Sequence, residues 1–234
     1  MTEYNLKFDT RHIKREFQKA LRGSIPKILT ELITNADDSY RRLAQNQGNS
    51  KEVPKLEMPA PIIIEFNRRK NLFSVTDHAE GLTDKQMEDR FVTYGRDSRD
   101  HQSGHNTRGL FGKGLRDVLF TQHHGRVKSI KDGKFYVCEF RWKDKAGNNS
   151  PMIDIKAPRP VDESLRKALG ITTNGTRVEF ELAKDVRKPQ TPKLLETLNR
   201  FYMLRNINAN GERQIVLRVL RNAGKTENYI LGML

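Results

Sequence analysis

The segment ELITNADDSY, residues 31–40, combines an apolar helical pattern with three acidic side chains and one amide. Before it, Ser24 fits the N-cap position of a helix, and Pro26 suits the first helical turn. From there, apolar side chains recur at helical spacing: Ile25, Ile28, Leu29, Leu32, Ile33, Ala36, Tyr40 and Leu43. We therefore predict an amphipathic helix that begins after Ser24 and runs through this segment.

Three polar side chains form a stripe along the predicted helix. Glu31, Asn35 and Asp38 lie at i, i+4 and i+7, so they share one face close to the buried side. Carboxylates in such a place are costly unless something pairs with them. An amide oxygen suits Mg²⁺, and a carboxylate one turn away can orient a water that attacks a phosphoryl group. The alternative is an ordinary solvated helix face, which is typical of charge runs.

A second motif follows a predicted strand pair. Residues 62–66 and 72–76 alternate as two antiparallel strands, and Asp77 ends the second of them. A carboxylate there can accept a hydrogen bond from an exocyclic amine, which selects adenine over guanine. The small residues Ala79 and Gly81 allow a ring to approach the backbone closely. Taken alone, an aspartate in a turn at a strand end is common.

Two glycine motifs come later in the chain. Residues 108–115, RGLFGKGL, precede a predicted helix over 114–120, and such glycines expose N–H groups that can bind phosphate oxygens. The spacing differs from a Walker A loop, and a flexible linker is the alternative. Residues 94–108 are predicted to form a mobile loop. In the Gly-Thr turn before a strand over 176–182, the Thr176 hydroxyl can bond near a bound base, although a plain hairpin turn is the alternative.

The remaining predicted helices and strands also indicate an α/β fold. Thr83 and Gln86 form a capping-box signature for a short helix to Phe91. Further strands are predicted over 126–130, 135–142, 153–155, 215–220 and 229–231, with a helix over 191–204. This order favours a two-layer α/β sandwich. We divide the chain into an N-terminal arm (1–23), a main domain (24–188) and the start of a second unit (189–234).

The composition of the chain indicates which partners and which cellular compartment are expected. The formal net charge is +14, and residues 121–234 hold 22 Lys and Arg against 12 Asp and Glu. Such a surplus favours a polyanionic partner, although a solvated basic surface is the simpler interpretation. The apolar runs are shorter than the roughly 18 residues of a membrane span, so no membrane partner is expected. The single cysteine, Cys138, fits a reducing, cytoplasmic setting and a packing role, and the histidines complete no zinc pattern.

Taken in order, the motifs E-x3-N-x2-D, D-x-A-x-G, G-x2-G-x-G and G-T resemble those of the GHKL superfamily over roughly residues 24–183. This superfamily includes gyrase B subunits, ninety-kilodalton heat-shock chaperones, histidine kinases, MutL and MORC proteins, and the motif style is nearest to the MORC, chaperone and MutL branch. The resemblance implies the Bergerat fold, in which a mixed, mostly antiparallel sheet carries helices on one face. ATP lies between the helices and the sheet, under a glycine-rich lid.

The resemblance also implies roles for individual residues. Glu31 corresponds to the general base, Asn35 to the Mg²⁺ ligand, Asp38 to a polar contact from the helix, and Asp77 to the acceptor of the adenine amine. The other nucleotide contacts implied are Ala79, Gly81, the lid residues Gly109, Leu110, Phe111, Gly112, Lys113 and Gly114, and Thr176. Ala79 departs from the family pattern because it replaces the first glycine of its box. Its methyl group is tolerable if φ is negative there.

The function implied is slow, Mg²⁺-dependent ATP hydrolysis that couples lid closure to homodimerisation of a larger, nucleic-acid-associated protein. Glu31 argues for hydrolysis, since the histidine kinases of this superfamily lack a comparable water-activating glutamate. An autokinase is disfavoured further because no helical segment with a phosphoacceptor histidine precedes the domain. Two alternatives stay open: a chaperone-like ATP clamp that acts on protein clients, and a switch that binds ATP without hydrolysing it.

Overall fold

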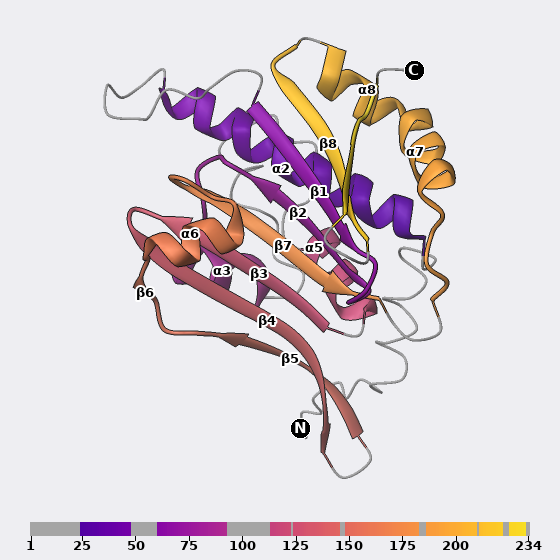
Figure 1. Cartoon of the computed structure of the whole chain (residues 1–234). Coiled ribbons are helices and arrows are strands. Elements are labelled where there is room, and N and C mark those ends of the chain that lie inside the picture. Colours follow the sequence, from indigo (N-terminus) through magenta and orange to yellow (C-terminus); the bar gives the residue numbers. More distant parts are fainter. Residues whose placement is uncertain are drawn as a thin grey trace, which may run out of the picture.

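The computed structural model describes residues 24–47, 60–92, 113–122, 124–145, 148–182, 186–209, 211–221 and 225–232 (Figure 1). Its helices are α2 (Ile25–Gln47), α3 (Asp84–Phe91), α5 (Lys113–Thr121), α6 (Glu163–Leu169), α7 (Thr191–Arg200) and α8 (Tyr202–Ala209). Its strands are β1 (Ala60–Asn67), β2 (Leu72–Asp77), β3 (His124–Lys131), β4 (Lys134–Lys145), β5 (Asn148–Ile155), β6 (Arg159–Pro160), β7 (Gly175–Glu181), β8 (Arg213–Leu220) and β9 (Thr226–Ile230).

All of these strands belong to one open, mixed sheet. The order across it is β5-β4-β3-β7-β2-β1-β8-β9, and β6 pairs with β4 outside this path. Every pairing is antiparallel except that of β1 with β8, which is parallel along the whole of both strands. The predicted α/β class and the mixed, mostly antiparallel sheet are therefore confirmed.

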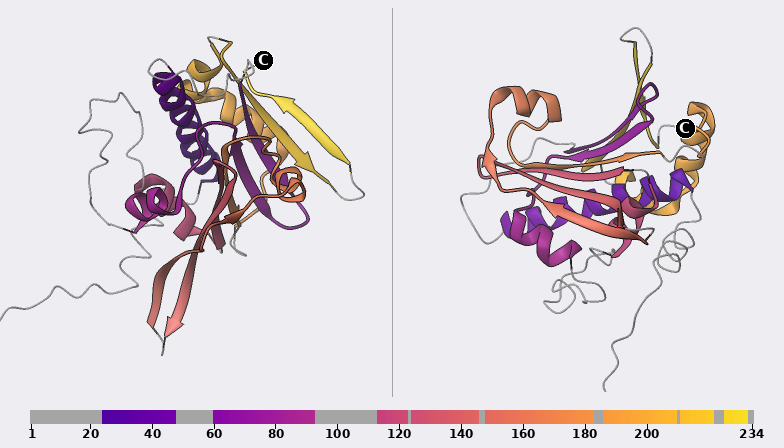
Figure 2. Two further views of the ribbon diagram at one scale, coloured as in Figure 1. Left: turned by 90° about the vertical axis from the view of Figure 1, so that its left-hand side faces the viewer. Right: turned by 90° about the horizontal axis from the view of Figure 1, so that it is seen from below.

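The main core fills one face of the sheet. Strand β1 alternates buried and half-buried residues, and its buried side chains Ile62, Ile64 and Phe66 point toward the helices. Phe73 of β2 stacks between Phe66 and Phe180, with ring centroids 4.0 and 5.4 Å away. Helix α2 buries its predicted apolar stripe in the same core, and α3, α5, α7 and α8 cover the rest of this face (Figure 2).

Helix α3 shows how local sequence sets an element boundary. Thr83 Oγ1 accepts a hydrogen bond from the Gln86 N–H at 3.2 Å, and Gln86 Oε1 accepts from the Thr83 N–H at 2.9 Å. This reciprocal arrangement satisfies two N–H groups that a helix start leaves unbonded. The predicted capping box is confirmed, and the helix ends at Phe91 as expected.

The segment after Pro189 joins the same sheet and core. β8 pairs with β1, and Leu194, Leu198, Leu204 and Ile207 of α7 and α8 pack into the main core. The single helix predicted over 191–204 is two helices, because Phe201 takes an extended conformation (φ −72°, ψ 114°) between them. Within the described residues, no helix combines the length and the apolar character needed to cross a membrane.

Helix α6 lies over the opposite face of the sheet (Figure 2), a placement that the sequence did not lead us to expect. Asp162 caps its N-terminus by accepting a hydrogen bond from the Leu165 N–H at 2.7 Å, and Gly170 ends it in a left-handed conformation (φ 69°). Ile130, Phe135, Leu169 and Ile171 form a small second core beneath it. The same face also carries ion pairs between neighbouring strands: Glu65 of β1 with Arg177 of β7, Lys128 of β3 with Glu179 of β7, and Arg126 of β3 with Glu139 of β4.

Candidate functional site

The structure brings two of the predicted motifs together at neighbouring strand ends. Asp77, the last residue of β2, pairs with Thr176 near the start of β7. Asp77 is only 6% exposed, and its carboxylate accepts a hydrogen bond from the Ala79 N–H at 3.0 Å. Burial raises the pKa of Asp77 to about 7, and the charge of Glu80 adds to this, against the N–H groups of Ala79 and Thr176 and the charge of Arg42. Near pH 7 the Asp77 carboxyl is therefore partly ionised, and it accepts hydrogen bonds when ionised and can donate one when protonated.

Two glycines allow the backbone to pack closely around Asp77. Gly81 has a left-handed conformation (φ 68°), and a Cβ there would lie 2.3 Å from the Ile130 carbonyl oxygen. A Cβ on Gly175 would lie 2.3 Å from the Asp77 carbonyl oxygen. A side chain at Gly81 would push the turn after β2 away from β3, and a side chain at Gly175 would push the ends of β2 and β7 apart. Ala79, in contrast, has a negative φ, because the described non-glycine residues with positive φ are Asn71 and Asp132. Its methyl group is therefore accommodated.

Ser129 of β3 links the turn after β2 to the turn before β7. Its Oγ accepts a hydrogen bond from the Leu82 N–H at 2.6 Å and donates one to the Gly175 carbonyl at 3.1 Å. The side chain is fully buried, so both bonds are shielded from water. Sequence reasoning missed this residue. The signal for it was the alternation of β3, which places a serine on the same side as the buried Val127.

The polar stripe of α2 lies at the border of the core, as predicted. Asp38 is fully buried, whereas Glu31 and Asn35 are half-buried. The Asn35 Oδ1 atom is buried and has no hydrogen-bond partner among the described residues. Buried polar atoms normally have a partner, so an oxygen of this kind fits a ligand to a hard cation such as Mg²⁺.

Helix α2 is held against the Asp77 strand end by a buried tyrosine. The Tyr40 hydroxyl donates to the Pro61 carbonyl at 2.7 Å and accepts from the His78 N–H at 2.8 Å. Burial raises the pKa of Tyr40, and the negative charge of Asp77 adds to this. The helix stripe and the Asp77 strand end thus lie on two elements that pack directly together.

The two adjacent aspartates of α2 have different surroundings. Asp37 forms ion pairs with Arg41 at 2.8 Å and with Arg213 of β8 at 3.4 Å. The Arg213 guanidinium also lies 4.6 Å from the centre of the Tyr40 ring. Asp37 therefore ties α2 to β8, which leaves Asp38 as the aspartate on the candidate-site stripe. Sequence spacing singled out Asp38 but gave no structural role to Asp37.

A further ion pair braces the turn that follows Asp77. The Arg42 Nε atom lies 2.7 Å from Glu80 Oε1, and both side chains are largely buried. A buried pair of this kind fixes geometry more reliably than it adds stability, because desolvation offsets much of the attraction. This pair connects α2 to the D-x-A-x-G turn, and sequence reasoning missed both partners.

Only part of the segment predicted to form a glycine-rich lid lies within the described residues. Gly109, Leu110, Phe111 and Gly112 lie outside them, and so do their predicted phosphate contacts. Lys113 and Gly114 form the first residues of α5, one residue earlier than the predicted helix start. Gly109 and Gly112 come before α5 in the sequence, and their contact with phosphate stays a prediction.

Histidine and cysteine side chains were the other candidates for metal binding or nucleophilic chemistry. In the described part of the chain, no group of three His, Cys, Asp or Glu side chains is placed to hold a metal ion. Cys138 is buried in the main core, and burial raises the pKa of its thiol to about 12, so it stays protonated and packs as an apolar residue.

Comparison with protein-family models finds no match to this chain, and comparison with curated proteins finds none either. The function therefore has to be argued from the residues themselves and from their geometry.

Proposed function

We propose that this chain binds Mg-ATP and hydrolyses it slowly. The observation that carries the proposal is the buried Asp77 carboxyl beside Thr176, at strand ends whose backbones approach closely at Gly81 and Gly175. A buried carboxyl with a strongly raised pKa, close to other polar groups, is a common mark of a functional site. The motifs around it resemble the nucleotide-binding motifs of GHKL proteins in their order along the chain.

In this proposal Asp77 selects the base. An ionised carboxylate accepts a hydrogen bond from the exocyclic amine of adenine, whereas guanine presents a carbonyl at that position, and two acceptors repel each other. A site built around a buried hydrogen bond rejects the wrong partner strongly, since the buried group would then be left unpaired. Thr176, its cross-strand neighbour, contributes a hydroxyl beside the same base.

The α2 stripe supplies the hydrolytic groups. Asn35 Oδ1 fits one ligand position of Mg²⁺, which when bound neutralises charge on the phosphates. Glu31, one turn earlier on the same stripe, holds and deprotonates the attacking water. Asp38 contacts the nucleotide from the helix side. Residues 109–114 donate backbone N–H groups to the phosphates at the N-terminus of α5.

The corresponding architecture is a Bergerat sandwich with a glycine-rich lid. The cover of α2, α3 and α5 over one face of the mixed sheet supports it. We propose further that lid closure favours a homodimer and that the partner is nucleic acid. The net charge of +14 and the basic surplus of residues 121–234 support a polyanionic partner.

Calorimetry with ATP and GTP, each with Mg²⁺, tests the base selection. ATP should bind and GTP should bind at least tenfold more weakly, since one buried mismatch costs about 1–3 kcal/mol. Equal affinity for the two nucleotides would remove Asp77 from base selection. Absence of binding for both would end the proposal.

Turnover measured on Glu31→Ala tests the hydrolytic role. This change should abolish hydrolysis and leave the affinity for ATP nearly unchanged, because the loss is confined to the transition state. Glu88→Ala, at an exposed position of α3, is the matched control and should hydrolyse ATP at the native rate. Native turnover in Glu31→Ala would exclude Glu31 as the base.

A further inference from the structure

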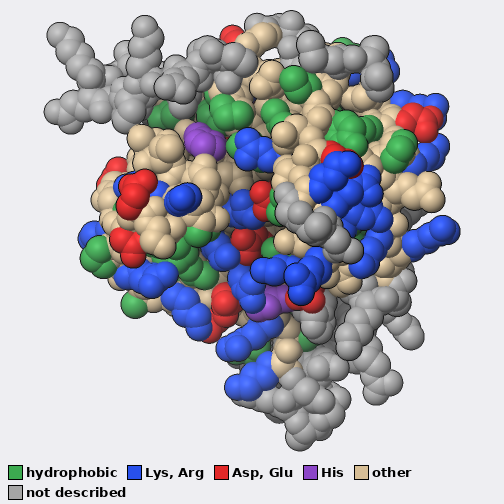
Figure 3. All heavy atoms as spheres, viewed as in Figure 1, with side chains coloured by type: hydrophobic (Ala, Val, Ile, Leu, Met, Phe, Trp, Pro, Cys, Tyr) green, Lys and Arg blue, Asp and Glu red, His purple; other side chains and the backbone are tan. Residues whose placement is uncertain are grey.

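A pocket of about 470 Å³ lies on the face of the sheet opposite the candidate ATP site. Its floor comes from β3, β4 and β7, its roof from α6, and one side from the segment around β6. Figure 3 looks onto this face and shows Lys and Arg side chains gathered across its middle, with Asp and Glu between them. Pockets of this size commonly hold small ligands.

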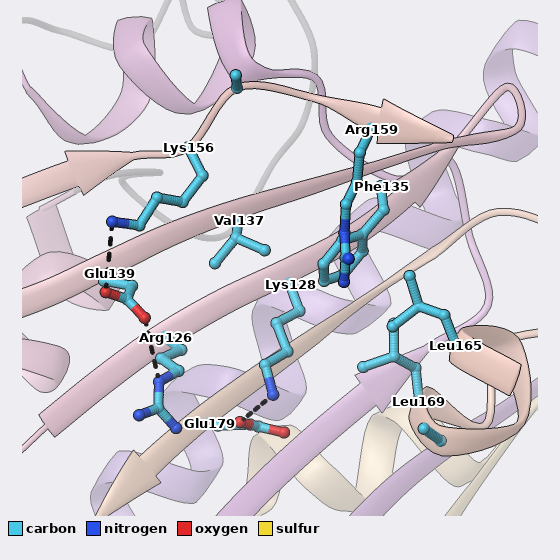
Figure 4. Close-up of a pocket in the computed structure, with 12 residues that line it drawn as sticks. Arg126, Lys128, Phe135, Val137, Glu139, Lys156, Arg159, Leu165, Leu169 and Glu179 are labelled. Atoms are coloured by element: carbon cyan, nitrogen blue, oxygen red, sulfur yellow. Dashed lines mark ion pairs between the residues drawn. The ribbon is translucent and has the colours of Figure 1, made fainter. Parts of the chain in front are cut away.

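One end of the pocket is apolar. Phe135 and Val137 of β4 form its floor, and Leu165 and Leu169 of α6 close it from the other side (Figure 4). These side chains continue the small second core under α6. A flat apolar group placed here would extend that core and remove apolar surface from water.

The other end is charged, and cations outnumber carboxylates there. The basic residues at this end are Arg126, Lys128 and Lys156, and the acidic ones are Glu139 and Glu179, whereas Arg159 lies beside Phe135 at the apolar end (Figure 4). Lys128 pairs with Glu179 at 2.7 Å, while Glu139 is shared by Arg126 at 3.5 Å and Lys156 at 4.0 Å. Lys156 also pairs with the half-buried Asp154 at 2.5 Å.

Arg159, the remaining basic residue of the pocket, takes part in none of these ion pairs. It forms no ion pair with any residue in the described part of the chain, and its guanidinium lies 5.1 Å from the centre of the Phe135 ring. A guanidinium on an aromatic face keeps its N–H groups available at the edge, in the planar fork that suits carboxylates and phosphates. The pocket thus sets an available anion-binding group directly beside an apolar wall.

We propose that this pocket binds a small organic anion in which one anionic group is attached to a flat apolar body. The apolar body lies over Val137 beside Phe135, and the anionic group bonds to Arg159 with Lys128 nearby. An inorganic anion would leave the apolar end unfilled, and a neutral aromatic molecule would leave Arg159 unpaired, so both parts of the ligand are required.

This site is separate from the candidate ATP site. On β3, Val127 and Ser129 face the main core and the turns around Asp77, whereas Lys128 and Ile130 face the α6 side. Anion binding at this pocket is therefore expected to be independent of nucleotide binding, and it is measured without nucleotide.

The probe is 2-naphthoate, titrated into the whole chain by calorimetry, with its neutral amide and with acetate as comparison ligands. The acid should bind saturably and at least tenfold more tightly than the amide, and acetate should not bind at the same concentrations. No saturable binding of 2-naphthoate, or equal binding of the acid and the amide, would overturn the proposal.

Two variants at exposed positions locate the binding. Arg159→Gln should weaken 2-naphthoate about tenfold, the loss of one charge-assisted hydrogen bond. Ala168→Trp should abolish binding because its ring fills the pocket from α6. The matched control is Lys134→Gln, an exposed cation of β4 that does not line the pocket, and it should bind as the native protein does. Binding unchanged in both pocket variants would place the probe elsewhere and refute the assignment.

Discussion

Replacing Asp77 by Asn should make the nucleotide-free protein more stable at alkaline pH while destroying its affinity for ATP. The reason is that the native structure buries the Asp77 carboxyl, and burial disfavours its charged form. The pKa of Asp77 is about 7 in the fold, against 3.8 for the ordinary group. Ionising it in the fold therefore requires free energy that ionising it in the unfolded chain does not.

The sign of the pH dependence follows from this raised pKa. The stabilising contribution of the protonated carboxyl is fully present below pH 3.8 and is lost as pH rises to about 7. With about 1.4 kcal/mol for each pKa unit, the loss is about 1.6 kcal/mol by pH 5 and about 4 kcal/mol by pH 8. Asn keeps the acceptor for the Ala79 N–H, but its amide donors lack acceptors, which costs about 1–3 kcal/mol at every pH.

Urea unfolding of both proteins at pH 5 and pH 8 measures the effect. The native protein should lose about 3 kcal/mol more than Asp77→Asn between the two pH values, and the variant should be the more stable at pH 8. Asp132→Asn, at an exposed turn position, is the control and should follow the native protein. A native pH dependence in Asp77→Asn would show that the carboxyl is not strained by burial, and the argument for its functional role would lose its main support.

Three further outcomes are expected. Ser129→Ala leaves the Leu82 N–H without its acceptor and should lower the free energy of unfolding by about 1–3 kcal/mol, with weaker ATP binding; Ser74→Ala, a buried serine whose Oγ has no hydrogen-bond partner among the described residues, should be nearly neutral in urea unfolding. Mg-ATP should slow hydrogen exchange across residues 95–113, and identical exchange with and without nucleotide would reduce those glycines to a linker. Duplex DNA should bind with a slope of about −0.9 in log K against log salt for each phosphate contact, and absence of DNA binding at low salt would end the nucleic-acid hypothesis and favour protein clients.

Local patterns were enough to predict the elements whose determinants are close together in sequence. The helical spacing from Ile25 to Leu43 fixed α2, and the Thr83 and Gln86 pair fixed the start of α3. Strands were harder to delimit. Only residues 153–155 of β5 alternate clearly, yet the strand begins at Asn148, because pairing with β4 continues through a polar stretch that includes Pro151.

The sequence predicted the polar groups of the candidate site, but it did not predict the residues that hold these groups in place. Spacing identified Asp77, Thr176 and the α2 stripe, since these belong to short motifs. The Arg213 pair with Asp37 and the Ser129 bridge join residues far apart in the chain, and no local pattern announces such partners. Helix α6 was missed for another reason: Asp162 before it and Gly170 after it are local cap signals that were overlooked, whereas the face of the sheet that it covers depends on distant residues.

The sheet gives its two faces different chemistry through the simple alternation of β3. Ser129 fixes the turns around a carboxyl whose burial destabilises the nucleotide-free fold, and a bound base would offset that strain by hydrogen bonding the charged form. One residue earlier, Lys128 faces the pocket under α6 and is already paired with Glu179. Because adjacent residues of one strand point to opposite faces, the two sites share backbone but no side chain. Changes at Arg159 or Ala168 should therefore alter anion binding and leave the strand ends at Asp77 and Thr176 as they are.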